Sequence, residues 1–190
     1  MILLGLTGSI GMGKSTTAKM FADAGIPVWD ADGAVRDLYG PGGAAGPALE
    51  AEFPGILRHD GSVDRAKLRA RVTEDPGILD RINTIIHPLV AQNRQAFLAD
   101  QTGLVILDVP LLFETGLDAA CDRVAVVSVD PATQRQRVLA RGTMTEADFD
   151  AILSRQVPDI EKRDRADYII DTSTLSLAQD MVSKIIVELT

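Results

Sequence analysis

The distribution of hydrophobic residues along the chain predicts buried strands that alternate with helices. Several apolar runs are short and continuous, as in strands of a parallel sheet that is covered on both faces. These runs are residues 2–6, 26–29, 104–107, 124–129 and 168–170. Apolar residues spaced three and four apart predict helices at residues 15–24, through much of 60–100, and at 175–188. Because helices separate the strands, the pattern favours an α/β fold with a five-stranded parallel sheet and helices on both faces.

Two stretches between these strands are too long to be simple connections. Residues 34–100 are predicted to form an inserted helical subdomain, in which the glycine- and proline-rich residues 40–47 form a loop. A second, smaller insertion at residues 138–165 is expected to act as a lid. The rest of the chain is predicted to form the core of a single domain. This core comprises residues 1–33, 101–137 and 166–190.

Composition and charge argue against several classes of function. The chain is 46% hydrophobic and 24% charged, and it has no apolar run of about 18 residues, so no membrane span is expected. Residues 1–6 lack the basic flank of a signal peptide. The formal net charge of −8 is a poor match to a nucleic-acid surface. The only cysteine, Cys121, permits no internal disulfide. We therefore expect a cytoplasmic protein that binds neither nucleic acid nor membrane.

The segment Gly8–Ser15, with the sequence GSIGMGKS, fits the pattern G-x-x-x-x-G-K-[ST] of a phosphate-binding loop. It follows an apolar strand and opens a helix, which is the context that this pattern requires. Glycine lets backbone N–H groups approach phosphate oxygens, and the start of the helix adds a positive dipole. Lys14 is expected to reach the β- and γ-phosphates of a nucleotide, and the Ser15 hydroxyl to ligate Mg²⁺.

Aspartates follow two predicted strands at the edge where open α/β sheets bind ligands. Asp108 ends the third strand, where an aspartate of a nucleotide-binding sheet holds Mg²⁺, usually through water. A helix cap or a turn is the alternative role for this residue. Asp30 and Asp32 follow the second strand. Either is a candidate general base for an attacking hydroxyl or a cap for a helix that starts near Gly33, and spacing alone does not choose between them.

Arginines after the fourth strand are candidates to stabilise the charge of a transferring phosphoryl group. They are Arg135, Arg137 and Arg141, of which the last two are four apart and share one helical face. Arg141 borders the predicted lid, although a solvated helix surface is the alternative for each arginine. The two histidines, His59 and His87, lack the spacing of metal ligands, so no zinc site is predicted and a structural role is the default for His87.

The ordered set of motifs resembles the dephospho-coenzyme A kinase family over nearly the whole chain. Residues Asp108–Glu114, with the sequence DVPLLFE, are the most family-specific block. The other matching blocks are Leu6–Ser15, Asp30–Asp32, Asp60–Gly61, Asp64–Arg65 with Leu68, Ile86–Pro88, Gln134–Val138 with Arg141, Arg155–Gln156, Lys162 and Ala166–Asp171. Ser9 and Met12 depart from the family's usual glycine and smaller residue. Thr172 replaces the usual asparagine, which puts in doubt any contact of that asparagine with the nucleotide base.

The resemblance implies transfer of the ATP γ-phosphate to the 3′-hydroxyl of dephospho-CoA, which gives CoA and ADP in the last step of CoA synthesis. It implies a catalytic set of Asp32 as the base, Lys14, and Arg141 closing over the γ-phosphate with the lid. The residues implied to bind ATP are Gly11, Met12, Gly13, Lys14, Ser15 and Thr16. Those implied to bind the acceptor are Asp32, Arg65, His87, Leu111, Leu112 and Phe113. Mg²⁺ is implied at Ser15 and Asp108.

Three other functions fit the residues less well. Another small-molecule kinase of the same fold would not require the block at 108–114. A GTP-dependent switch requires an N-K-x-D motif, which the chain does not contain. A nucleic-acid-dependent ATPase conflicts with the net negative charge and the short length. The expected ligands are ATP and dephospho-CoA with Mg²⁺, and the expected assembly is a monomer or a weak homo-oligomer.

Overall fold

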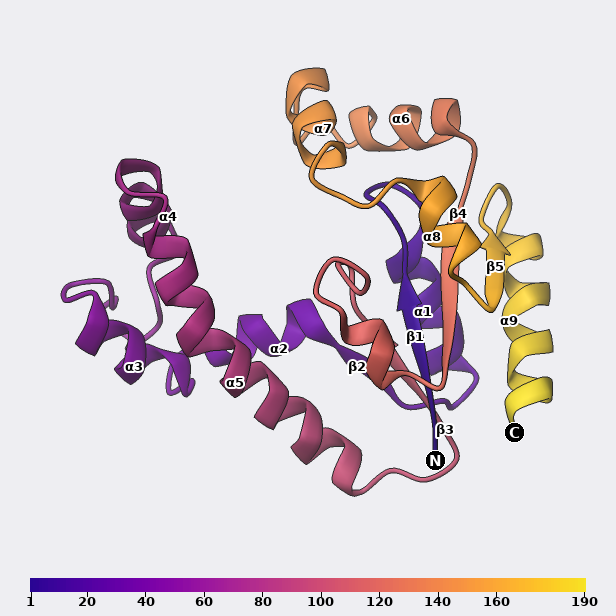
Figure 1. Cartoon of the computed structure of the whole chain (residues 1–190), viewed down its shortest axis with the longest axis horizontal. Helices are drawn as coiled ribbons and strands as arrows, with labels where there is room; N and C mark the ends of the chain where they lie inside the picture. Colours follow the sequence, from indigo (N-terminus) through magenta and orange to yellow (C-terminus); the bar gives the residue numbers. More distant parts are fainter. The chain divides into compact units, whose positions relative to one another are not determined.

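The computed structural model describes residues 1–190 and contains one 5-stranded sheet in which all paired strands run parallel. The strand order is β2-β3-β1-β4-β5 (Figure 1). The strands are β1 (Ile2–Thr7), β2 (Val28–Asp30), β3 (Leu104–Asp108), β4 (Arg123–Ser128) and β5 (Tyr168–Asp171). The prediction of an α/β fold with a five-stranded parallel sheet is therefore confirmed.

The chain divides into two compact units. The first comprises Met1–Asp30 and Gln101–Thr190 and contains the whole sheet, and the second comprises Ala31–Asp100. The helices of the first unit are α1 (Lys14–Asp23), η1 (Leu117–Ala120), α6 (Pro131–Leu139), α7 (Glu146–Leu153), α8 (Asp159–Asp164) and α9 (Leu175–Leu189). Those of the second are α2 (Ala31–Leu38), α3 (Ala45–Glu52), α4 (Arg65–Glu74) and α5 (Ile78–Ala99). No helix has both the length and the apolar character needed to cross a membrane.

The core of the first unit explains why its strands are continuous apolar runs. Leu4 and Leu6 of β1 and Ile106 of β3 are fully buried, since helices cover both faces of the sheet. Figure 1 shows α1 behind the sheet and α8 in front of it. In the register of the two strands, Leu6 lies opposite Asp108. The ends of β1 and β3 therefore meet at the same edge of the sheet, at its centre.

The second unit has a hydrophobic core of its own. Leu49 and Ile56 are fully buried within it, and α2, α3 and α4 all contact α5. The predicted loop at residues 40–47 is wrong in its second half, because α3 begins at Ala45. Pro47 does not prevent this helix, since a proline in the first turn lacks an N–H that has no helical partner there in any case.

A buried ion pair joins α8 to the loop that follows β3. Lys162 is fully buried, and its Nζ lies 3.0 Å from Oε1 of Glu114. The same carboxylate oxygen accepts a hydrogen bond of 2.8 Å from the backbone N–H of Val157. Burial raises the pKa of Glu114, but the Lys162 ammonium and the Val157 N–H together outweigh it and hold the pKa of this carboxyl below its usual value.

Replacement of Lys162 by methionine should lower the free energy of unfolding by about 3–5 kcal/mol at neutral pH, because it leaves the mostly buried carboxylate of Glu114 without its cation. Since the pKa of Glu114 is lower in the folded state, the pair stabilises the fold above the pKa of an unfolded glutamate, and this contribution is lost as the pH falls through the folded pKa. Denaturant unfolding at neutral and acidic pH measures both effects. Lys184→Met, on the exposed face of α9, is the matched control, and an equal small loss in both variants would contradict the prediction.

Candidate active site

The segment between β1 and α1 forms a tight loop at residues 8–13. Gly11 and Gly13 have φ angles of 80° and 91°, in the left-handed region that residues with a side chain avoid. A Cβ added at Gly13 would also lie only 3.2 Å from the side chain of Thr172. The first N–H groups of an α-helix have no acceptor within the helix, and no side chain caps them at the start of α1, at Gly13. The loop therefore has the form of an anion-binding site.

Lys14 and Asp108 are in direct contact beside this loop. The Lys14 Nζ lies 2.5 Å from Oδ1 of Asp108, and the two side chains are only 13% and 8% exposed. This contact follows from the sheet, because α1 starts just after β1 and Asp108 ends the neighbouring β3. An ammonium has three N–H donors, so two remain to bind phosphate oxygens. The structure thus brings together two of the residues singled out in the sequence.

A cavity of about 320 Å³ is lined by the loop and by residues from the predicted lid. Residues 8–16 form most of its wall, and Pro110, Arg141, Ile152 and Gln156 complete it. All six residues expected to bind ATP, which are residues 11–16, lie in this wall. The cavity contains backbone N–H donors, an ammonium and a guanidinium, which together suit a polyphosphate.

A second cavity, of about 340 Å³, adjoins the same loop on the side of β5 and α9. Its lining includes Thr16, Arg137, Thr172 and Leu175, together with Arg141, which lines both cavities. The loop glycines Gly11 and Gly13 also line both cavities. A nucleotide whose phosphates lie in the first cavity has space for its sugar and base in the second.

The three candidate arginines have different surroundings. Arg135 pairs with Glu146 and Asp150 of α7, so it connects α6 to the predicted lid. Arg137 donates a hydrogen bond of 2.7 Å to the Thr172 carbonyl oxygen. The prediction that Arg137 and Arg141 share a helical face is wrong, because α6 ends at Leu139 and Arg141 lies beyond it. Arg141 nevertheless lines the cavity with the phosphate-binding loop.

Thr172 holds the loop from the end of β5. Its hydroxyl donates a hydrogen bond of 2.7 Å to the Met12 carbonyl oxygen. The same hydroxyl lies 3.3 Å from the backbone carbonyl oxygen of Ser128. Thr172 is 7% exposed, so these are interior contacts. Met12 is anchored a second time, because its Sδ accepts the N–H of Val129 at 3.2 Å. The methionine and the threonine that depart from the family pattern thus both fix the backbone of the loop to the sheet.

The residues expected to hold Mg²⁺ offer suitable donors. Ser15 is exposed in the first turn of α1, immediately after Lys14, and Asp108 lies against Lys14. Mg²⁺ prefers oxygen ligands and is usually held by one or two protein groups together with water and substrate phosphates. A hydroxyl and a carboxylate beside a phosphate-binding loop match this preference, so the donor set fits the ion.

Asp32, Arg65 and His87 all lie in the second unit. Asp32 is exposed in the first turn of α2, which begins at Ala31 and not near Gly33 as the sequence suggested. Arg65 opens α4, and its guanidinium carbon lies 5.0 Å from the centroid of the Tyr39 ring. His87 is exposed on α5. The roles of these three residues in acceptor binding and catalysis stay predictions.

Three residues after β3 were also expected at the acceptor site. Leu111 is 43% exposed, whereas Leu112 is fully buried and Phe113 is 6% exposed. The Phe113 ring packs under the guanidinium of Arg165, with 4.1 Å between the guanidinium carbon and the ring centroid. Burial argues against direct acceptor contacts by Leu112 and Phe113, which instead support the loop that presents Leu111.

A family model described as dephospho-CoA kinase matches residues 2–177, which is most of the chain. The chain belongs to the dephospho-CoA kinase family. A dephospho-CoA kinase of Bradyrhizobium diazoefficiens is 56% identical over 177 residues, which cover 91% of this chain and 87% of the relative. One of Mesorhizobium japonicum is 56% identical over 194 aligned positions, which cover 100% of this chain and 97% of the relative.

Solved structures share the fold of this chain. The protein TT1252 of Thermus thermophilus has a TM-score of 0.87 at 31% identity, covering 100% of this chain and 98% of its own. Shikimate kinase of Acinetobacter baumannii has a TM-score of 0.51 at 15% identity, covering 97% of this chain and 90% of its own. At that identity the similarity shows a shared kinase fold alone.

Thr172→Val should raise the KM for ATP about tenfold and lower the free energy of unfolding by about 1–3 kcal/mol, because it leaves the buried Met12 carbonyl without its donor. Thr172→Ser keeps the hydroxyl and should resemble the unmodified enzyme in both measurements. Steady-state kinetics and denaturant unfolding test the pair. If valine and serine behave alike, the hydroxyl does not hold the loop.

Two residues near the loop were not assigned a role from the sequence. Gln134 and Gln156 appeared only as parts of blocks that match the dephospho-CoA kinase family. In the structure both bond to the backbone of Ile10 in the loop. Their spacing to Ile10 along the chain carries no periodic or motif signal, so only the folded structure shows the contact.

Proposed function

We propose that this member of the dephospho-CoA kinase family transfers the γ-phosphate of ATP to the 3′-hydroxyl of dephospho-CoA and so forms CoA and ADP, the last step of CoA biosynthesis. The observation that carries the proposal is the cavity in which the phosphate-binding loop, Lys14 and Arg141 converge. This cavity occurs in a chain that is 53–56% identical to several curated dephospho-CoA kinases over at least 91% of its length.

ATP binding follows from the donors that line the two cavities. The backbone N–H groups at the start of α1 and the Lys14 ammonium bind the β- and γ-phosphates. The sugar and base extend past Thr16 toward Arg137 and Thr172. Ser15 and Asp108 would hold Mg²⁺, which when bound neutralises negative charge on the phosphate oxygens.

The acceptor is proposed to bind through the second unit and the loop after β3. Asp32 accepts the proton of the 3′-hydroxyl as this oxygen attacks the γ-phosphate in line with the departing ADP oxygen. Arg65 and His87 bind the anionic part of dephospho-CoA, and Leu111 contributes an apolar contact. Both aspartates are exposed, Asp30 at the end of β2 and Asp32 in the first turn of α2, and Asp32 is proposed over Asp30 on the family resemblance.

Charge stabilisation during the transfer is proposed for Arg141. It lies between α6 and α7, at the start of the predicted lid, and lines the cavity of the loop. A guanidinium binds two phosphoryl oxygens at once and stabilises the negative charge that spreads over them. Closure of residues 138–165 over the phosphates would also exclude water and limit hydrolysis of ATP.

An acceptor panel tests the proposed function. ADP release is measured with Mg-ATP in parallel reactions that contain dephospho-CoA, AMP, shikimate or no acceptor. The phosphorylated product is identified by mass spectrometry. Release that depends on dephospho-CoA and yields CoA supports the proposal. Turnover with another acceptor overturns the acceptor assignment, and equal release without any acceptor identifies an ATPase.

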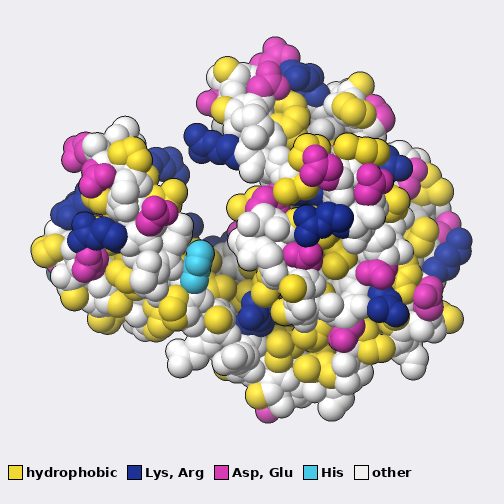
Figure 2. Space-filling model, in the orientation of Figure 1, with side chains coloured by type: hydrophobic (Ala, Val, Ile, Leu, Met, Phe, Trp, Pro, Cys, Tyr) yellow, Lys and Arg dark blue, Asp and Glu magenta, His cyan; other side chains and the backbone are white.

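We also propose a cytoplasmic enzyme that acts as a monomer or a weak homo-oligomer without a nucleic-acid partner. The support is the net charge of −8 and the mixture of acidic and basic side chains over the visible face in Figure 2. Such a surface has no continuous field to attract an anionic polymer. Light scattering at two concentrations tests the assembly, and salt-dependent binding to duplex DNA would contradict the absence of that partner.

A further inference from the structure

The peptide groups on both sides of Ile10, in the phosphate-binding loop, are held by two glutamine side chains. The backbone N–H of Ile10 donates a hydrogen bond of 3.1 Å to Oε1 of Gln156. The backbone carbonyl of Ile10 accepts one of 2.7 Å from Nε2 of Gln134. The backbone groups of Ile10 determine how each glutamine carboxamide is oriented. The Ile10 N–H needs an acceptor oxygen, and the Ile10 carbonyl needs an N–H donor.

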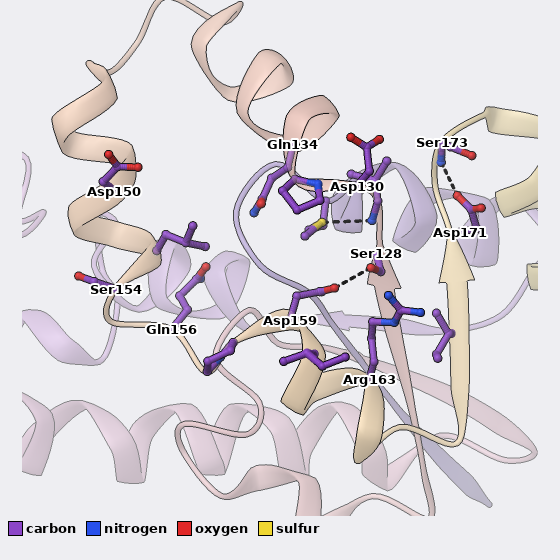
Figure 3. A pocket seen from close by; sticks show the side chains of 17 residues that line it. Ser128, Asp130, Gln134, Asp150, Ser154, Gln156, Asp159, Arg163, Asp171 and Ser173 are labelled. Carbon is purple, nitrogen blue, oxygen red and sulfur yellow. Dashed lines mark hydrogen bonds between the residues drawn. The ribbon is translucent and has the colours of Figure 1, made fainter.

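One glutamine precedes the predicted lid and the other lies within it. Gln134 lies on α6 before the lid and is only 3% exposed, and Gln156 lies in the segment that follows α7 (Figure 3). The residue after Gln156 is fixed as well, since the Val157 N–H bonds to Glu114. The helix that leads into the lid and a segment within the lid are therefore both tied to the loop through the backbone of one residue, Ile10.

These bonds set the direction of neighbouring peptide groups. In a trans peptide the carbonyl and the following N–H point in opposite directions. Gln134 holds the Ile10 carbonyl, so the N–H of Gly11 must point away from Gln134, and Gly11 lines both cavities of the proposed ATP site. By the same rule, because Gln156 holds the Ile10 N–H, the carbonyl of Ser9 in that peptide group points away from Gln156. The Ser9 carbonyl accepts a hydrogen bond of 3.1 Å from the Met12 N–H.

We propose that Gln134 and Gln156 are positioning residues that aim the Gly11 N–H at the ATP phosphates and thereby connect the lid to the phosphate-binding loop. The inference rests on the proposed function, because the aim of this N–H matters only if the loop binds ATP. Gln134 acts without touching the substrate, because it lines neither cavity of the proposed ATP site. A shift of the segments that carry them, as the lid opens or closes, changes the peptide planes around Ile10.

Gln134→Glu is the sharpest test, because glutamate has almost the same shape but an ionised carboxylate cannot donate to the Ile10 carbonyl. We expect kcat/KM for ATP to fall about tenfold to hundredfold relative to the unmodified enzyme in mildly alkaline buffer. The KM for dephospho-CoA at saturating ATP should stay unchanged. Gln136→Glu adds the same charge at an exposed position of α6 and should leave all constants unchanged.

A pH profile separates positioning from a general loss of structure. Gln134 lines a further cavity, shown in Figure 3. Burial favours the protonated form of a carboxyl at this position, as do the carboxylates of Asp130, Asp150, Asp159 and Asp171 in the same lining, whereas Arg163 there opposes them. In its protonated form, the carboxyl introduced by Gln134→Glu can donate to the Ile10 carbonyl again. The ratio of kcat/KM for ATP between Gln134→Glu and the unmodified enzyme should therefore rise as the buffer becomes mildly acidic. A ratio that stays low and flat, or a loss shared equally by Gln136→Glu, overturns the inference.

Gln156→Met keeps the inference falsifiable if the first variant does not fold. Gln156 is partly exposed, so methionine is tolerated, but it offers no oxygen to the Ile10 N–H. ATP binding, measured by titration without acceptor, should weaken about tenfold while the melting temperature of the ligand-free protein changes little. Unchanged ATP affinity overturns the inference. If the unmodified enzyme binds ATP but does not phosphorylate dephospho-CoA, the proposed function fails while this test still stands.

Discussion

Replacing Asp32 by asparagine should lower kcat by about 10²- to 10⁴-fold, while the affinity for ATP changes little. Asparagine keeps the size and the hydrogen-bonding reach of aspartate but removes the basic oxygen that takes the proton of the attacking hydroxyl. We propose that the loop and Lys14 bind the ATP phosphates, so nucleotide affinity is not expected to depend on this carboxylate. The measurement is steady-state release of ADP with dephospho-CoA, combined with an independent titration of ATP.

Two further variants make this result specific to Asp32. Asp30→Asn tests the other aspartate of the same block, and it should retain most of its turnover if Asp32 is the base. Asp37→Asn removes an exposed carboxylate from the same helix, α2, and should behave as the unmodified enzyme. Near-normal turnover of Asp32→Asn together with a large loss in Asp30→Asn would transfer the base role to Asp30.

Lys14→Met should weaken ATP binding and lower kcat by about 10²- to 10³-fold, because it removes a cation that the transferring phosphoryl group needs. Methionine keeps much of the length of the side chain without its charge. The control is Lys19→Met, on the same helix, because Lys19 pairs with Asp23 at the exposed surface. Titration with ATP and single-turnover kinetics together separate the loss of binding from the loss of rate.

The contact between Lys14 and Asp108 adds a second measurement to this prediction. Because Asp108 is only 8% exposed, loss of the ammonium leaves a mostly buried carboxylate without this partner and should lower the melting temperature. The double variant Lys14→Met with Asp108→Asn should recover stability but not activity. If it recovers activity as well, the cation acts only by neutralising Asp108.

The parts of the fold that were predicted from the sequence are those with a local physical signature. Continuous apolar runs such as residues 104–107 predicted buried parallel strands, because such strands face helices on both sides. The loop at Gly8–Ser15 was predicted because its glycines, lysine and serine are required at fixed spacing. Its flanking strand and helix were found where the motif requires them.

The parts that were missed depend on contacts between distant segments. Nothing local shows that Gln134 and Gln156 meet the same residue, Ile10. Likewise, the sequence marks Thr172 only as a departure from a family pattern, whereas the structure shows its hydroxyl bonded to the loop. Arg141 was expected on a helix that in fact ends at Leu139, because spacing gives a helical face but not the point at which the helix stops.

The bond between Met12 and Thr172 has a consequence for the synthesis of the chain. Its two partners are 160 residues apart, so the loop cannot form this bond until the residue after β5 has emerged from the ribosome. The second unit is one continuous stretch with its own core, and its contacts are complete much earlier. Because domains tend to fold as their sequence emerges, Ala31–Asp100 should form first, and the nascent chain should acquire nucleotide binding only after β5 has emerged.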